Sequence, residues 1–281
     1  MLKCSVLSLA FCLCTIATSS THAKRDTLVM GFKDVAKGEL IGDVNNNEGL
    51  YKELYEKAAA KIGLNLRIVR LPKMRIHTAL SKGLIDFYPG ASFSKGRTKY
   101  LYYLPNGLKT KEVLVSSLLK ADITNMNNVS GKLIAGPSSS KINWDTKYDN
   151  LSIKVIKSPT ILVVIREIQS KGADFYVADI EMIDSYKKNN KIKKYSGIGI
   201  KIHYNAINKN FISMYFGFSR QSSFYSERPN PRFIETEELS IKNFPTLITK
   251  ESVAYKLYLA LQELEKDGTT KRLYDKYHKN Q

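Results

Sequence analysis

The first ninety residues switch between two hydrophobic periods. Apolar runs at 27–33 and 64–71 have the length and composition of strands. Between them, apolar residues recur every four positions over 49–62, which predicts an amphipathic helix. A second helix is expected over 72–83, because it opens with proline and ends at glycine. With the apolar stretch 84–88 as a third strand, this order predicts a mostly parallel sheet with helices on its faces.

A similar order returns after an extended crossing at 111–117. Apolar spacing predicts a helix that starts near Ile161 and ends at Gly172. The strands expected around it are 132–135, 151–156 and 173–177. Both units contain a helix that stops at glycine and then a short strand that begins around an aspartate and ends at a polar group. We therefore expect two similarly built α/β lobes.

The C-terminal part leads back to the first lobe through an apolar strand at 214–219. Residues 220–250 contain three prolines and are expected to be irregular. A last helix is predicted over 251–266 and a short turn over 272–277. We expect this division: a leader at 1–23, lobe 1 at 24–112, lobe 2 at 113–213, and the return to lobe 1 at 214–281 with a 220–250 insertion.

The N-terminus has the three parts of an export signal. Lys3 is a positive residue, 6–16 is an apolar run too short to span a bilayer, and Ala23 is a small residue at the end of the segment. We expect cleavage after Ala23 and a periplasmic protein. The cysteines all lie inside this signal, so disulfides, thiolate zinc sites and cysteine nucleophiles are not expected in the mature chain.

The net charge of +18 favours anionic partners. The lysines are scattered, and the one cluster, 187–194, is interpreted as a solvated face. Export also argues against nucleic acid. We therefore expect a small-molecule ligand and a monomer.

In open α/β sheets, ligands bind beyond the carboxyl ends of the strands. The residues at those ends in the first lobe are Phe32, Lys33, Asp34, Lys73, Arg75, Gly90, Ser92 and Arg97, and in the second lobe Ser139, Ser140 and Asp179. These residues are the candidate ligand contacts.

Arg97 carries the most specific chemistry among them. A planar guanidinium pairs with a carboxylate through two parallel hydrogen bonds, and Ser92 and the backbone near Gly90 can add donors. Asp179 could accept from an ammonium group, or it could cap the following helix. The serines at 138–140 could bind an anion at a helix N-terminus or cap that helix.

Signals for catalysis and for metals are weak. His77, His203 and His278 have no metal-ligand partner three or four residues further along the chain, so no metal is expected. The sequence contains no nucleophile elbow, phosphate-binding loop or dinucleotide fingerprint. We expect no cofactor and no enzymatic activity.

Four segments resemble the extracellular solute-binding protein family 3, the periplasmic receptors of amino-acid ABC importers. Segment 83–97 is similar to the family's G-x-x-D and G-x-T-x-T-x-x-R, and 172–179 is similar to its G-x-x-D-A-x-x-x-D. Residues 49–51 resemble its helix opening, and 267–277 resemble its closing signature. The resemblance implies a two-lobed periplasmic-binding-protein-like fold of type II, with two mixed sheets joined by a two-strand hinge. It also implies partnership with a membrane permease.

The resemblance assigns roles to several candidates. Arg97, Ser92 and Gly90 match the positions that hold the ligand α-carboxylate, and Asp179 matches the aspartate that takes the α-amino group. Lys73 and Arg75 stand where many members have apolar or aromatic contacts, and Pro137 stands where many have a lysine or a small residue. The ligand could therefore differ from an ordinary amino acid and carry extra negative charge.

The resemblance leaves two further functions open. One is a cyclohexadienyl-dehydratase-like enzyme on the same scaffold. The other is a sensor or accessory binding protein without its own permease.

Overall fold

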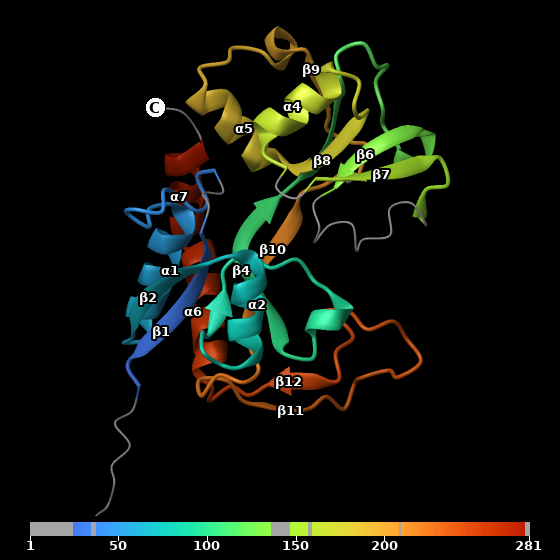
Figure 1. The fold of residues 1–281 in the computed structure, drawn as a ribbon. Coiled ribbons are helices and arrows are strands. Elements are labelled where there is room, and N and C mark those ends of the chain that lie inside the picture. Colours follow the sequence, from blue (N-terminus) through green and yellow to red (C-terminus); the bar gives the residue numbers. More distant parts are fainter. Residues whose placement is uncertain (1–24, 35–37, 136–146, 157–158, 208, 279–281) are drawn as a thin grey trace, which may run out of the picture.

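A computed structural model describes residues 25–34, 38–135, 147–156, 159–207 and 209–278. This part of the chain forms two five-stranded mixed sheets and a small two-stranded sheet. Figure 1 shows the two large sheets as separate groups of strands, one above the other. None of the helices described in it is long and apolar enough to cross a bilayer.

The first sheet has the strand order β2-β1-β3-β10-β4. Its strands are β1 (Thr27–Lys33), β2 (Asn65–Leu71), β3 (Phe87–Tyr88), β4 (Leu101–Thr110) and β10 (Ile212–Ser219). β1 is parallel to β2 and β3, as the sequence predicted, and β10 is antiparallel to β3 and β4.

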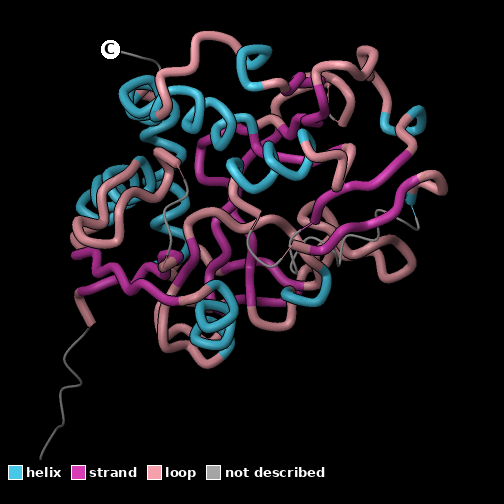
Figure 2. Tube along the Cα trace, turned by 45° about the horizontal axis from the view of Figure 1, so that its top comes forward, coloured by secondary structure: helices cyan, strands magenta, loops and turns pink. Residues whose placement is uncertain are grey.

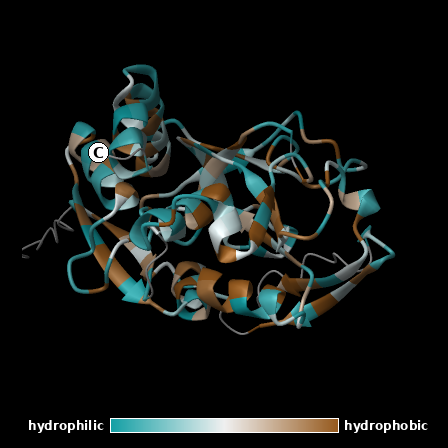
Figure 3. Ribbon diagram, turned by 90° about the horizontal axis from the view of Figure 1, so that it is seen from above, coloured by the Kyte–Doolittle hydropathy of each residue, from teal (hydrophilic) through white to brown (hydrophobic). Residues whose placement is uncertain are grey.

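Helices pack on both faces of this sheet (Figure 2). They are α1 (Leu50–Lys61), α2 (Lys73–Ser81), α6 (Val253–Lys266) and α7 (Thr269–His278). The face under α1 and α6 is rich in aromatic rings: Phe87 lies 4.9 Å from Tyr55 and 6.0 Å from Phe216 between ring centroids. The other face buries Ile76 and Leu80 of α2. Figure 3 shows hydrophobic colour on several strands, and helices along which hydrophobic and hydrophilic colours alternate.

Two predicted elements have the wrong length. The third strand was expected over 84–88 but contains only Phe87 and Tyr88, because Gly83 turns the chain at φ +68° and leaves Leu84 68% exposed. The expected terminal turn is a ten-residue helix, α7. It is stabilised by the burial of Leu273 and by a hydrogen bond of 2.8 Å from the Thr269 backbone N–H to Asp267 Oδ1.

The second sheet has the order β7-β6-β8-β5-β9. Its strands are β5 (Glu112–Ser117), β6 (Gly131–Ala135), β7 (Leu151–Val155), β8 (Phe175–Asp179) and β9 (Ile200–His203), and its helices are α4 (Ile161–Gln169) and α5 (Ile180–Asn189). β6 is parallel to β7 and β8, whereas β5 is antiparallel to β8 and β9. Short 3₁₀ turns cover Lys95–Arg97, Met126–Asn128 and Tyr195–Ile198.

Two crossings connect the sheets. On one, a single residue, Lys111, separates β4 from β5. The other is the segment 204–211 between β9 and β10. The Lys111 ammonium donates to Asn205 Oδ1 and to the Lys209 carbonyl, both at 3.0 Å, so it ties the two crossings together.

The segment 220–250 was expected to be irregular, but it contains a hairpin. β11 (Glu227–Pro229) pairs antiparallel with β12 (Thr246–Ile248). Figure 1 shows this hairpin at the edge of the first sheet that lies farthest from the second sheet.

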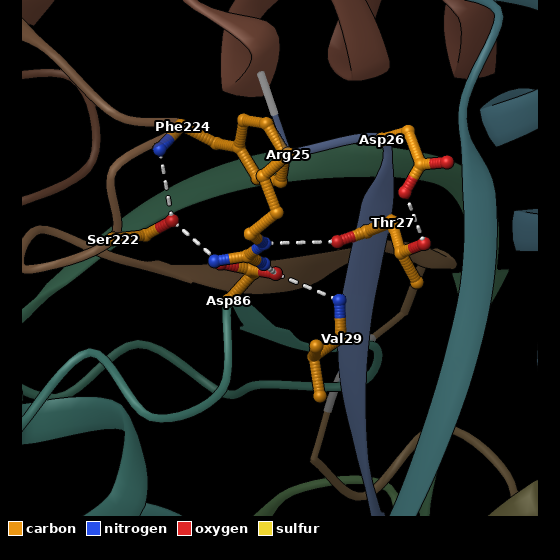
Figure 4. Close-up of polar contacts among 7 residues, drawn as sticks. All are labelled: Arg25, Asp26, Thr27, Val29, Asp86, Ser222 and Phe224. Atoms are coloured by element: carbon orange, nitrogen blue, oxygen red, sulfur yellow. Dashed lines mark hydrogen bonds and ion pairs between the residues drawn. The ribbon is translucent and has the colours of Figure 1, made fainter. Parts of the chain in front are cut away.

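Asp86 fixes the chain just before β3 (Figure 4). Its side chain is fully buried and accepts from the Val29 backbone N–H at 2.7 Å, from the Ser222 hydroxyl at 2.6 Å and from the Arg25 guanidinium. Arg25 in turn lies 4.3 Å over the ring of Phe224. We call this group the Asp86 clamp.

The second sheet repeats part of this geometry. Asp174 precedes β8 as Asp86 precedes β3, and its carboxylate accepts from the Lys132 backbone N–H at 2.9 Å. In both cases the backbone N–H of the aspartate donates to the carbonyl of the residue whose N–H its side chain accepts. This residue is Val29 for Asp86 and Lys132 for Asp174. The aspartates expected at the start of these strands therefore join each strand to its parallel neighbour.

Candidate functional site

The candidate site is built around the loop that follows β3. The Ala91 N–H donates to the Tyr215 carbonyl at 2.7 Å and anchors the start of the loop to β10. The 3₁₀ turn Lys95–Arg97 closes the loop, and the Thr98 hydroxyl donates to the Lys95 carbonyl at 2.7 Å. Arg97 is thus carried by a hydrogen-bonded turn, while Ser92 lies exposed between the two anchors.

Gly90 has a reason to be glycine. A Cβ at this position would collide with the hydroxyl of Tyr51, the second residue of α1. Tyr51 is 1% exposed, and in the described part of the chain its hydroxyl has no hydrogen-bond partner. The side chain of Tyr51 therefore packs so closely against the loop backbone that only glycine fits at position 90.

Three of the candidate cations contribute to a lowered pKa of one histidine. His77 on α2 is half-buried, and burial together with the charges of Arg97, Lys73 and Lys33 lowers its pKa to about 4. The hydroxyl of Tyr100 lies 3.3 Å from His77 Nδ1. The end of β1, the start of α2 and the loop after β3 thus concentrate positive charge around a neutral imidazole.

The charge of Arg97 also affects the pKa values of two tyrosines. Burial raises the pKa of Tyr103 to about 12, and the charge of Arg97 works against that rise. The pKa of Tyr100 is also raised by burial and opposed by Arg97. The guanidinium of Arg97 therefore lies near the rings of Tyr100 and Tyr103. The Phe93 ring packs against Tyr103, with 5.2 Å between ring centroids.

The lowered pKa of His77 predicts that the stability of the protein depends on pH. The folded pKa of about 4 is below the ordinary value of 6.5, so between these values the unfolded chain binds more protons at this position than the folded chain. The free energy of unfolding should therefore fall as the pH falls from about 6.5 to about 4. His77→Gln should flatten that decline in urea titrations at pH 4.5 and pH 7, and equal declines in both proteins would contradict the assignment.

The second lobe places an acidic group near the same loop. Asp179 ends β8 and stands at the N-cap position of α5, but its side chain makes no capping bond there. Burial, followed by the charges of Tyr88, Asp179 and Glu181, raises the pKa of Tyr51 well above its usual value. Asp179 therefore lies within electrostatic range of the tyrosine that abuts Gly90.

Glu181 was missed by the sequence reasoning. It is 2% exposed and accepts from the Thr110 hydroxyl at 2.6 Å and from the Tyr274 hydroxyl at 3.3 Å. It thus joins α5 to β4 and α7, across the two sheets. An acidic residue in a first helical turn is usually an exposed partner of the helix dipole, so the local sequence gave no signal of this role.

The other candidates lie in varied surroundings. Phe32 is fully buried in the core beneath α1, and the Arg70 guanidinium lies 5.4 Å from its ring. The Lys33 carbonyl accepts from Arg70 Nη1 at 3.0 Å. Asp34 and Arg75 are exposed. Ser139 and Ser140 lie outside the described residues.

Two cavities formed by the described residues do not contain these groups. One, of about 190 Å³, lies where α1 meets α6, and the other, of about 150 Å³, lies in the second lobe between Asn127 and Val129 on one side and residues 147–150 on the other. No group of three histidine, cysteine or acidic side chains that could hold a metal occurs within the described ranges. The charge pattern, and not cavity shape, defines the candidate site.

The sequence profile of one family covers most of the chain, from residue 29 to residue 280. The chain belongs to the bacterial extracellular solute-binding proteins, family 3. The resemblance found in the four sequence segments is therefore confirmed. A search of curated proteins gives no significant match.

Solved structures show the same fold as this family 3 protein. An ancestral arginine-binding protein bound to arginine is 19% identical, with a TM-score of 0.61 over 90% of this chain and 98% of that chain. The arginine-, lysine- and histidine-binding protein of the thermophilic bacterium Geobacillus stearothermophilus is 16% identical, with a TM-score of 0.61 over 91% and 96%.

A third structure is an ancestral amino-acid-binding protein described as a precursor of cyclohexadienyl dehydratase. It is 16% identical, with a TM-score of 0.58 over 90% of this chain and 96% of that chain. These likenesses confirm the two-lobed fold with two mixed sheets.

Proposed function

We propose that this family 3 protein is a periplasmic receptor that closes on a small ligand with a carboxylate and delivers it to the membrane permease of an ABC importer. The proposal rests on membership of family 3 and on the positive charges of Arg97, Lys73 and Lys33, which together with burial lower the pKa of His77. Closure is a hinge motion at the two crossings, in which ligand contacts on both lobes shift an existing open–closed equilibrium. In this proposal the export signal is cleaved after Ala23, and the mature chain is a monomer.

The charges suggest how the ligand lies. Its carboxylate pairs with the Arg97 guanidinium, and the loop backbone near Gly90 and the Ser92 hydroxyl add donors. An ammonium group, where the ligand has one, points toward Asp179 and the Tyr51 hydroxyl. The ammonium groups of Lys33 and Lys73 attract a second negative charge on the ligand. An acidic amino acid or a dicarboxylate therefore suits the positive charge of this site better than a basic amino acid does.

The same field argues for binding without chemical conversion. A general acid near neutral pH needs a proton to give, but the pKa of His77 is about 4 and its imidazole is neutral at pH 7. The buried carboxylate of Glu181 is engaged by Thr110 and Tyr274. Neither group suits the protonation step of a dehydratase.

A thermal-shift screen of the protein purified after export tests the proposal. The informative pairs differ in charge and little in shape: L-glutamate against L-glutamine, succinate against succinamide, with L-arginine and prephenate added. A ligand at a hundred times its Kd stabilises the folded state by about 2.7 kcal/mol. We expect the anionic member of each pair to give the larger shift. Selective stabilisation by L-arginine would overturn the expected second negative charge on the ligand, and turnover of prephenate would overturn the binding role itself.

A further inference from the structure

The 220–250 insertion contacts the turn that carries Arg97. Nη1 of Arg220 donates to the carbonyl of Thr98, the residue after Arg97, at 2.7 Å. The backbone N–H of Arg220 donates to the Tyr100 carbonyl at 2.9 Å. One residue at the start of the insertion therefore holds the turn's exit at two points.

Glu227 on β11 fixes the guanidinium that makes this contact. Its Oε1 accepts from Arg220 Nε at 3.2 Å and also from Nη2. Its Oε2 accepts from the Thr246 hydroxyl at 2.7 Å and from the Tyr225 hydroxyl. Although burial opposes it, these donors lower the pKa of Glu227.

Both charged side chains are mostly shielded from water. The side chains of Arg220 and Glu227 are 22% and 24% exposed, and Phe244 lies 5.8 Å from the guanidinium. The ring of Phe244 also packs 5.2 Å from Tyr102 on β4. Such a pair, with its donors and acceptors engaged, is more rigid than an exposed ion pair.

The insertion reaches the entrance of the turn as well. Lys95 Nζ pairs with Glu238 at 2.6 Å, although both side chains are more than half exposed. Ile241 packs into the cluster that contains Phe93 and Tyr103. The turn is thus held at its exit by a shielded pair and at its entrance by an exposed one.

We infer that Arg220 and Glu227 are positioning residues for ligand binding: they hold the Lys95–Arg97 turn so that the Arg97 guanidinium faces the ligand. The inference rests on the proposed function, because it assumes that Arg97 binds the ligand. It gives the 220–250 insertion a role in the affinity of the site. A guanidinium placed about 1 Å off a bidentate geometry loses much of its advantage over a simple charge.

Hydrogen–deuterium exchange tests the hold directly. The amides of Arg97, Thr98 and Tyr100 donate within or next to the turn, to Ser94, Lys95 and Arg97, so their exchange rates report its opening. We expect Arg220→Ala to speed their exchange about tenfold or more while β1 and β2 exchange as in the wild type. Arg220→Lys and Glu227→Gln should give intermediate rates. Arg228→Ala, an exposed neighbour on β11, is the matched control and should change nothing.

Ligand affinity separates a positioning role from a merely structural one. The probe is L-glutamate or succinate, whichever stabilises the wild type more, titrated by calorimetry into each variant. We expect weaker binding in the order Arg228→Ala, Arg220→Lys, Arg220→Ala, following the exchange rates. Unchanged exchange in Arg220→Lys, Glu227→Gln and Arg220→Ala would overturn the inference, as would faster exchange with wild-type affinity.

The two proposals fail in different ways. If Arg97→Ala binds the probe like the wild type, or if no probe binds the wild type, the proposed function fails. The exchange rates of the turn then decide by themselves whether Arg220 and Glu227 hold it.

Discussion

Asp86→Ala should destabilise the first lobe by about 2–5 kcal/mol, because it removes a fully buried acceptor from two buried donors and from the partly exposed Arg25. The carboxylate is fully buried, and its removal leaves the Val29 N–H, the Ser222 hydroxyl and the Arg25 guanidinium without their acceptor. Each unsatisfied buried donor costs about 1–3 kcal/mol by itself. Asp86→Asn keeps one acceptor and should cost less.

Urea denaturation measures this effect, and the chain supplies its own control. Asp174 has the same place in the second sheet, but its side chain is 38% exposed and its partner Lys120 is 39% exposed. Asp174→Ala should therefore cost only about 1 kcal/mol. If both variants lost equal stability, burial of the Asp86 clamp would not be the source of its strength.

Arg97→Ala should weaken ligand binding by about a hundredfold or more, since truncating one partner of a hydrogen-bonded charge pair costs about 2–5 kcal/mol. Arg97→Lys keeps the charge but loses the planar fork, so part of the affinity should return. The measurement is calorimetric titration with the ligand that stabilises the wild type most in the thermal-shift screen.

The control for this variant lies two residues away. Lys99 is exposed, and Lys99→Ala removes the same unit of charge from the end of the same turn. Its affinity should stay close to that of the wild type, because an exposed charge outside the site acts only through a screened field. Equal losses in Arg97→Ala and Lys99→Ala would mean that net charge, and not a paired guanidinium, governs binding.

Most of the fold could be predicted from hydrophobic periodicity. The four-residue repeat over 49–62 became α1 with Leu54 and Ala58 buried, and β1 and β2 pair in parallel along their full lengths. The short third strand could not be predicted, because its length depends on the Asp86 clamp and on the turn at Gly83. Those contacts join residues far apart in the chain, such as Asp86 and Ser222, so a local pattern does not contain them.

The candidate site was predicted in part. The rule that strand ends meet at one edge of a sheet led to Lys33, Lys73 and Arg97, and these three cations do act on a common group. Their role in binding stays a prediction. His77 and Tyr51 were not selected, because each lies in a helix beside apolar residues, where most such side chains only pack. Their importance follows from neighbours that the local sequence does not identify.

The Asp86 clamp also has a consequence for processing of the precursor. If cleavage follows Ala23, Arg25 would be the second residue of the mature chain, where it pairs with the buried carboxylate of Asp86 and covers the Phe224 ring. A peptidase that trims two residues too many would remove this cation and leave the carboxylate of Asp86 uncompensated. The accuracy of leader removal would then affect the stability of the first lobe.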